Sequence, residues 1–159
     1  MLKRRMLRTV IVVGLVIATL LGSASVASAS PTSFSARAVH GGGSGAIGVA
    51  LTGALSWSNR SVALTSVRLY TGSYEQAYVQ IFPWNGNTPV TSVYLPSSGG
   101  LYKNDAVAGW WNLYTIPVDG SDYYGGITEI EIRVGDYQHR IVGVAVCKRA
   151  ASSCTSYQE

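Results

Sequence analysis

Charged, histidine and cysteine side chains are all scarce in this sequence. Lysine and arginine together number 12, aspartate and glutamate 8, histidine 2 and cysteine 2, among 159 residues. The charged share of 13% is roughly half of what a globular domain usually carries. A structural zinc site needs about four nitrogen or sulfur ligands, and the two cysteines are expected to bond to each other instead. We therefore expect no zinc site.

Long apolar runs are also missing, with one exception near the start. Residues 10–21 are largely apolar, basic residues precede them, and Ala27-Ser28-Ala29 follows. A basic start, a short apolar core and an A-x-A end are the three parts of a secretory signal peptide. The run is shorter than the roughly 20 residues of a membrane-spanning helix. We expect residues 1–29 to be cleaved after Ala29, which leaves 30–159 as an extracellular chain without a membrane anchor.

The net charge of +4 comes from the predicted signal peptide. Lys3, Arg4, Arg5 and Arg8 all lie within it, and it contains no acidic residue. Its removal leaves as many basic as acidic residues, so the mature chain is formally neutral. A nucleic-acid-binding protein carries a basic patch or stripe, and we therefore expect no nucleic-acid partner. The paired arginines leave the export route open between the general secretory and the twin-arginine pathways.

The mature chain lacks helical periodicity, whereas alternation of apolar and polar residues is common. In 129–134, EIEIRV, charged and apolar residues alternate, which is typical of a half-buried strand. The nearly all-apolar run 141–147 follows, and we expect the two runs to form a hairpin whose second strand is covered on both faces. Turn signals recur about every ten residues. We therefore predict an all-β fold, a single domain over 30–159 that is an antiparallel β-sandwich of about seven to nine short strands.

The two cysteines, Cys147 and Cys154, lie close to the C-terminus. An even number of cysteines in an exported protein indicates a disulfide, and two cysteines allow one intramolecular pairing. We expect the bond to join the C-terminal tail to the last strand. A redox-active pair usually has the closer C-x-x-C spacing.

The segment that contains the cysteines, VAVCKRAASSC at 144–154, resembles the last strand and tail of small secreted actinobacterial β-proteins. Similar tails often carry acidic and glycine residues between the cysteines, where this chain has Lys148 and Arg149. The resemblance implies export and an all-β fold. It implies no activity.

Two short patterns invite a cofactor or metal interpretation. Residues 43–48, GSGAIG, have the spacing of a dinucleotide-binding loop, but no helix signal follows and 61–71 lacks the acidic residue that the motif requires. Asp119 and Asp122 flank a turn and offer oxygen atoms to a calcium ion, although carboxylates are usual turn residues. We expect no cofactor and no bound metal.

The residues best suited to ligand binding are aromatic and lie near turn signals. An exposed aromatic ring offers a flat apolar face, on which the C–H face of a sugar stacks. Trp110 and Trp111 are adjacent, so in a strand they point to opposite faces, and one of them lies outside the core. The alternative, that these aromatics are ordinary strand and core residues, stays open. The candidate ligand-binding residues are Trp84, Trp110, Trp111, Tyr123 and Tyr124.

These observations favour a secreted, non-catalytic binding module whose partner is a cell-wall or environmental polysaccharide. Such a protein predicts several exposed aromatic rings in one plane. A first alternative is an inhibitor of another extracellular protein, which predicts a protruding rigid loop such as Pro96–Gly100. A second is a small hydrolase that uses Asp136 and His139, which predicts a serine and a carboxylate within hydrogen-bond reach of the histidine.

Overall fold

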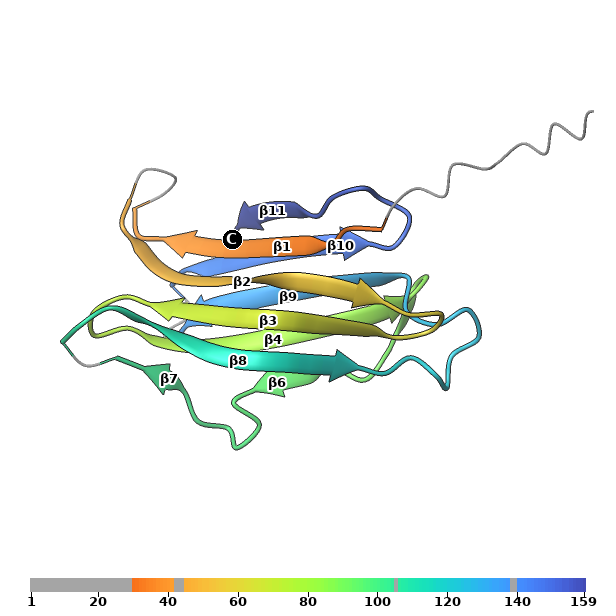
Figure 1. Cartoon of the computed structure of the whole chain (residues 1–159). Coiled ribbons are helices and arrows are strands. Elements are labelled where there is room, and N and C mark those ends of the chain that lie inside the picture. Colours follow the sequence, from red (N-terminus) through yellow and green to blue (C-terminus); the bar gives the residue numbers. More distant parts are fainter. Residues whose placement is uncertain (1–29, 42–44, 105, 138–139) are drawn as a thin grey trace, which may run out of the picture.

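The computed structural model describes residues 30–41, 45–104, 106–137 and 140–159 (Figure 1). The predicted signal peptide, 1–29, lies outside the described residues. In the described part of the chain all regular structure is β-strand, and no helix is long and apolar enough to cross a membrane. The strands form two antiparallel sheets that pack on each other. This architecture confirms the predicted β-sandwich.

The first sheet has four strands in the order β1-β2-β3-β8. Hairpin connections join β1 to β2 and β2 to β3, whereas β8 enters from the other sheet. The strands are β1 (Ser33–Val39), β2 (Ile47–Trp57), β3 (Val62–Thr71) and β8 (Gly109–Val118).

The second sheet has seven strands in the order β11-β10-β9-β4-β5, and β6 and β7 also pair with β4. The described residues therefore contain eleven strands, more than predicted, because several are pieces of two to four residues. The strands are β4 (Gln76–Asn85), β5 (Thr88–Pro89), β6 (Val93–Leu95), β7 (Tyr102–Lys103), β9 (Glu129–Asp136), β10 (Val142–Lys148) and β11 (Thr155–Gln158).

The predicted C-terminal hairpin and disulfide are both confirmed. Strands β9 and β10 pair in antiparallel register from Val142 opposite Gly135 to Lys148 opposite Glu129. Strand β10 lies between β9 and β11 and is buried along most of its length. The Cys147–Cys154 bond, with an S–S distance of 2.07 Å, joins β10 to the segment that leads into β11.

The core lies between the two sheets and consists of branched aliphatic side chains from their inward faces. Apolar side chains at alternate strand positions point the same way, so the seven longer strands each deliver two to four of them to the core. Their removal from water is the main favourable term in folding. Fully buried members include Leu51, Leu64 and Leu69 from the first sheet and Ile81, Ile130 and Ile132 from the second.

One long side of the sandwich is closed, where β1 of the first sheet meets β11 of the second (Figure 1). The Ser156 hydroxyl donates a hydrogen bond to the Ser35 carbonyl at 2.6 Å. The Gln158 side-chain amide both accepts from the Val39 N–H, at 3.0 Å, and donates to the Val39 carbonyl, at 2.8 Å. Side chains of β11 therefore satisfy backbone groups of β1 that no strand of its own sheet pairs.

The opposite long side is open. Strand β8 is the last strand of its sheet, while β6 and β7 belong to the other sheet and face it across the sandwich (Figure 1). A hollow of about 430 Å³ lies between them and is lined by apolar side chains that include Leu95, Tyr102, Leu113 and Ile116. The aromatic residues at the start of β8 lie along this open side.

Candidate functional site

The structure separates the five predicted aromatic residues into two groups. Trp110 and Trp111 begin β8, whereas Tyr123 and Tyr124 follow its end. Strand β8 has 10 residues, and a strand of that length spans about 30 Å. Trp84, at the end of β4, belongs with the second group, because the neighbouring asparagine donates a hydrogen bond to the Tyr124 carbonyl at 2.7 Å. The five side chains therefore do not share one surface.

The second group offers no joined aromatic surface. Tyr124 is 96% exposed, Tyr123 packs against the core, and Trp84 is half-buried. Among the residues that the structure describes, none of these three rings packs on another aromatic ring. A flat ligand would meet a single isolated tyrosine here.

Trp110 and Trp111 point to opposite faces of β8, as predicted. Trp111 lies on the inward side at the open edge, where its ring packs on Tyr102 of the second sheet with ring centroids 5.7 Å apart. Its indole N–H donates a hydrogen bond to the hydroxyl of the buried Thr71 at 3.3 Å. Trp111 therefore bridges the two sheets, while 36% of its surface remains exposed.

Trp110 lies on the outward face of the four-stranded sheet and is 48% exposed. Its ring packs on Tyr70 of β3, with centroids 5.3 Å apart and ring planes tilted by 58°. The Arg68 guanidinium lies over the indole, with its carbon 4.7 Å from the ring centroid. This contact is a cation–π interaction, which fixes the otherwise flexible arginine beside the two rings.

Strand register extends this aromatic pair into a surface that crosses the whole sheet. Residues opposite each other in neighbouring strands lie side by side, and every second residue of a strand points outward. The residues on the other side of these strands, such as Ala36, Leu51 and Leu69, are fully buried, which fixes the direction. The two outward rows are Arg37-Ala50-Tyr70-Trp110 and Ser35-Thr52-Arg68-Asn112.

We call these eight residues the outer platform. Each row crosses three strand spacings, which is about 14 Å. At the β1 end the platform continues into an open hollow of about 310 Å³ against β11, lined by Ser35, Arg37, Val39, Ser156, Tyr157 and Gln158. The surface thus has the aromatic pair and the Asn112 amide at the β8 end, the Thr52 hydroxyl in the middle, and a hollow with a tyrosine at the β1 end.

Tyr70 and Arg68 were missed as candidates, although the sequence carried a signal for them. In 67–71, VRLYT, the two residues alternate with the apolar and buried positions of β3. Alternation of that kind marks Arg68 and Tyr70 as outward-facing residues. Alternation within β3 does not predict that these residues lie beside Trp110. That position depends on the pairing of β3 with β8, which are about forty residues apart.

The hydrolase hypothesis rested on Asp136 and His139, and His139 lies outside the described residues. Asp136 is 1% exposed and closes the turn between β9 and β10. It accepts hydrogen bonds from the backbone N–H groups of Arg140, at 2.7 Å, and Ile141, at 3.1 Å, and forms an ion pair with the Arg140 side chain at 3.1 Å. Burial alone would raise the pKa of Asp136, but these hydrogen bonds and the ion pair hold the pKa below its usual value.

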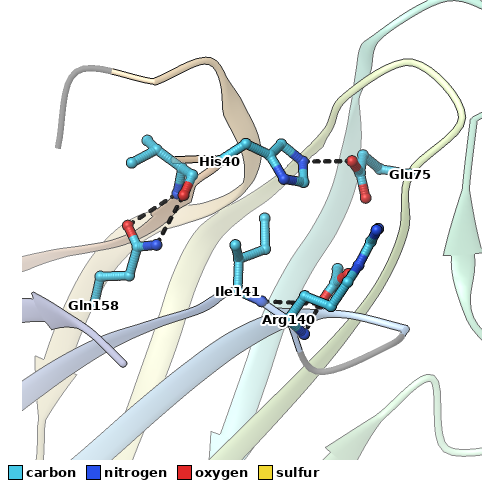
Figure 2. A network of polar contacts seen from close by, with 7 residues as sticks. His40, Glu75, Arg140, Ile141 and Gln158 are labelled. Carbon is cyan, nitrogen blue, oxygen red and sulfur yellow. Dashed lines mark hydrogen bonds and ion pairs between the residues drawn. The ribbon is translucent and has the colours of Figure 1, made fainter. Parts of the chain in front are cut away.

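A second polar contact lies near this turn. His40 Nε2 and Glu75 Oε1 are 2.6 Å apart and join the end of β1 to the segment before β4 (Figure 2). A small polar hollow of about 80 Å³ borders Glu75, Asp136 and Arg140. Glu75 pairs with His40, and Asp136 pairs with Arg140. Both carboxylates therefore act as structural cross-links.

The loop aspartates are placed as turn residues. Asp119 accepts hydrogen bonds from the Ser121 backbone N–H, at 2.9 Å, and from the Ser61 hydroxyl, at 2.9 Å. These contacts lower the pKa of Asp119, the Ser121 backbone N–H most strongly. Within the described residues, no group of three or more histidine, cysteine, aspartate or glutamate side chains could hold a metal ion.

The loop expected for an inhibitor, Pro96–Gly100, is an exposed turn that follows β6. The Gly99 N–H donates to the Pro96 carbonyl at 3.1 Å, and residues 97–100 are exposed. No aromatic residue lies within it. It is therefore a less distinctive surface than the outer platform.

Comparisons of the chain with protein-family models, with curated proteins and with solved structures found no match. The outer platform brings a half-exposed indole, a half-buried tyrosine, hydrogen-bonding groups and two arginines together on paired strands. Its chemistry suits reversible binding of a flat, hydroxyl-rich molecule.

Proposed function

We propose that the mature chain is a secreted, non-catalytic module that binds polysaccharide on the outer platform. The observation that carries this proposal is Trp110, a half-exposed indole on the edge strand β8 that packs against Tyr70 on the outward face of the sheet. Burial is the usual fate of such a large apolar ring. An exposed one on a rigid surface is suited to stacking on the apolar face of a sugar ring.

Polar groups around Trp110 complement such a ligand. Ser35 and Thr52 carry hydroxyls that both donate and accept, and the exposed Asn112 amide offers two donors and one acceptor. They lie in the row next to that of Trp110, two residues away along each strand. A sugar whose ring stacks on the aromatic pair would therefore bring its hydroxyls over these side chains.

The strands also preorganise the surface. Every residue of the outer platform belongs to a strand whose backbone is paired on at least one side. Binding to such a surface orders few additional groups, so little free energy is lost to conformational entropy. A surface of this kind supports affinity without a deep cleft, as an extended polymer requires.

Secretion is part of the proposal. The A-x-A pattern after a short apolar run supports export, and the Cys147–Cys154 disulfide is the kind of bond that forms and persists in oxidising surroundings. An exported binding module would meet cell-wall or environmental polysaccharide directly.

The test is retention of purified residues 30–159 on insoluble cellulose, chitin and peptidoglycan. Trp110→Ala removes the indole from the outer platform, and Tyr124→Ala removes an exposed ring at the far end of the molecule. We expect the unmodified chain and Tyr124→Ala to be retained on at least one polymer, and Trp110→Ala to be lost in the wash. Near-ultraviolet circular dichroism checks that each variant is folded.

Two results would overturn the proposal. One is that the unmodified chain is retained on none of the three insoluble polymers and binds none of the soluble glycans described below. The other is equal loss of retention in Trp110→Ala and Tyr124→Ala, because that would show binding without a defined site.

A further inference from the structure

The two sheets differ sharply in charge. The four strands β1, β2, β3 and β8, all within the described residues, contain no aspartate or glutamate. They contain two arginines, Arg37 and Arg68, and the outer platform carries both. Acidic residues instead occupy the second sheet, the loops and the C-terminus, including Glu129, Glu131 and Asp136 of β9.

Three cations on the side of the second sheet pair with these acidic residues, whereas Lys103 of β7 has no carboxylate partner among the described residues. Arg133 forms ion pairs with Glu131 and with Glu159, the latter at 3.1 Å. Lys148 pairs with Glu129 at 3.3 Å, and Arg140 pairs with Asp136. Much of the positive charge on this side of the molecule is therefore paired within the chain.

The arginines of the outer platform have no such neutralisation. Among the residues that the structure describes, no carboxylate pairs with Arg37 or Arg68. Arg68 lies over the indole of Trp110, which holds its planar group, and no described residue accepts a hydrogen bond from its N–H donors. Arg37 is exposed and lines the open hollow beside β11.

The spacing of the two arginines fits a polymer with repeated charges. Arg37 lies on β1 and Arg68 on β3, two strand spacings apart and offset by two residues along the strands, so their Cα atoms are about 12 Å apart. Two arginines carried at that spacing would meet charges on different residues of one chain. Guanidinium groups bind carboxylate and phosphate oxygens with two parallel hydrogen bonds.

From these observations we infer that the ligand of the outer platform is an anionic polysaccharide, whose carboxylate or phosphate groups are bound by Arg68 and Arg37 while a sugar ring stacks on Trp110. This inference rests on the proposed function and narrows its ligand class. The absence of carboxylates from the sheet removes the repulsion that such a polymer would otherwise meet.

The test compares ligands that differ in charge and share a backbone. Polygalacturonate and its fully methyl-esterified form carry the same sugars with and without carboxylates, and phosphocellulose beside carboxymethylcellulose separates phosphate from carboxylate as the bound group. Titration calorimetry with the folded mature chain measures affinity, at low and at high sodium chloride concentration.

The variants are Arg37→Gln, Arg68→Gln and, as a charge-matched control, Lys103→Gln on the exposed β7 strand of the other sheet. We expect binding of at least one anionic polymer, with affinity about tenfold weaker for each platform variant and unchanged for Lys103→Gln. Methyl-esterification of the ligand and added salt are each expected to lower the affinity.

The outcomes separate the inference from the proposed function. Equal affinity for the acid and its methyl ester, with loss in Trp110→Ala, would leave a glycan-binding platform and overturn the anionic ligand. An equal effect of Lys103→Gln and the two platform variants would also overturn it, because attraction would then depend on net charge alone. Failure to bind any of the soluble or insoluble polymers would overturn both.

Discussion

Gly143 of β10 faces the backbone of Arg37 in β1 so closely that a Cβ added to it would lie 2.6 Å from the Arg37 nitrogen. This contact brings β10 of one sheet against β1 of the other at the closed side of the sandwich. The contact fixes the position of β1, the strand that carries Arg37 and lines the hollow beside it. Because Gly143 has no Cβ, β10 can approach β1 this closely, and the approach positions this edge of the outer platform.

The substitution Gly143→Ala is expected to lower the free energy of unfolding. The added methyl group meets backbone atoms, which cannot move aside as a side chain does, and overpacking of this kind costs about 1–3 kcal/mol. Urea unfolding followed by tryptophan fluorescence measures the change. Gly100→Ala is the control, because its Cβ would have 3.7 Å to the nearest atom, and equal stability of the two variants would contradict the prediction.

Acid is expected to destabilise the fold partly through Asp136. The pKa of Asp136 is lower in the folded chain than in the unfolded chain, so the ionised carboxylate favours folding at pH values above about 4. That contribution is lost as pH falls through the unfolded and then the folded pKa. Unfolding free energies measured from pH 7 down to about pH 2.5 are expected to fall more steeply for the unmodified chain than for Asp136→Asn.

The Asp136→Asn variant is also expected to be less stable at pH 7, by about 1–3 kcal/mol, because a buried acceptor of several hydrogen bonds is weakened. Asp122→Asn removes an exposed carboxylate from the loop before β9 and serves as the control. Parallel pH profiles for Asp136→Asn and the unmodified chain would show that the turn carboxylate does not govern acid stability.

Alternation along single strands predicted the sandwich, the hairpin of β9 with β10, and the opposite directions of Trp110 and Trp111. These features depend on residues close in sequence, where a period of two is visible directly. The outer platform depends instead on which strands become neighbours. Arg37 and Trp110 share a row because β1, β2, β3 and β8 stack in that order, and pairings between distant segments leave no local signal.

The same reason explains why the five aromatic candidates did not converge. Each of them is an aromatic residue beside a turn or at a strand end, so the local sequence did not distinguish one from another. The length of β8 then places Trp110 and Tyr124 at opposite ends of the molecule. Sequence reasoning identified Trp110 as a candidate, while its partners Tyr70 and Arg68 required the register of β3 with β8.

Arg149 is expected to be a stabilising cross-link that lysine cannot replace. Its guanidinium donates to the carbonyl of Ile127 at 2.8 Å and to the carbonyls of Ser58 and Ser61, and lies 4.9 Å from the ring centroid of Trp57. It thereby joins the turn after β10 to two other loops. Burial lowers the pKa of Arg149, yet the group stays charged at neutral pH.

The substitution Arg149→Lys keeps the charge and loses the planar fork of donors. We expect it to lower the unfolding free energy by about 1–3 kcal/mol, because several carbonyls lose their donor together. Lys148→Arg, at the exposed neighbouring position, is the matched control and is expected to change stability little. Thermal unfolding of the two variants decides the matter, and an Arg149→Lys variant as stable as the unmodified chain would rule out the cross-link.

Reduction of the Cys147–Cys154 bond is expected to cost stability without abolishing the fold. The bond closes a loop with a sequence separation of 7, and chain-entropy arithmetic for a loop of that size gives about 2.5 kcal/mol. The buried apolar side chains of the core remain in place after reduction, and β11 keeps its hydrogen bonds to β1. Urea unfolding with and without a phosphine reductant measures the difference in free energy. A variant with both cysteines replaced by alanine should not respond to the reductant, and an equal response in the two proteins would mean that the reductant acts elsewhere.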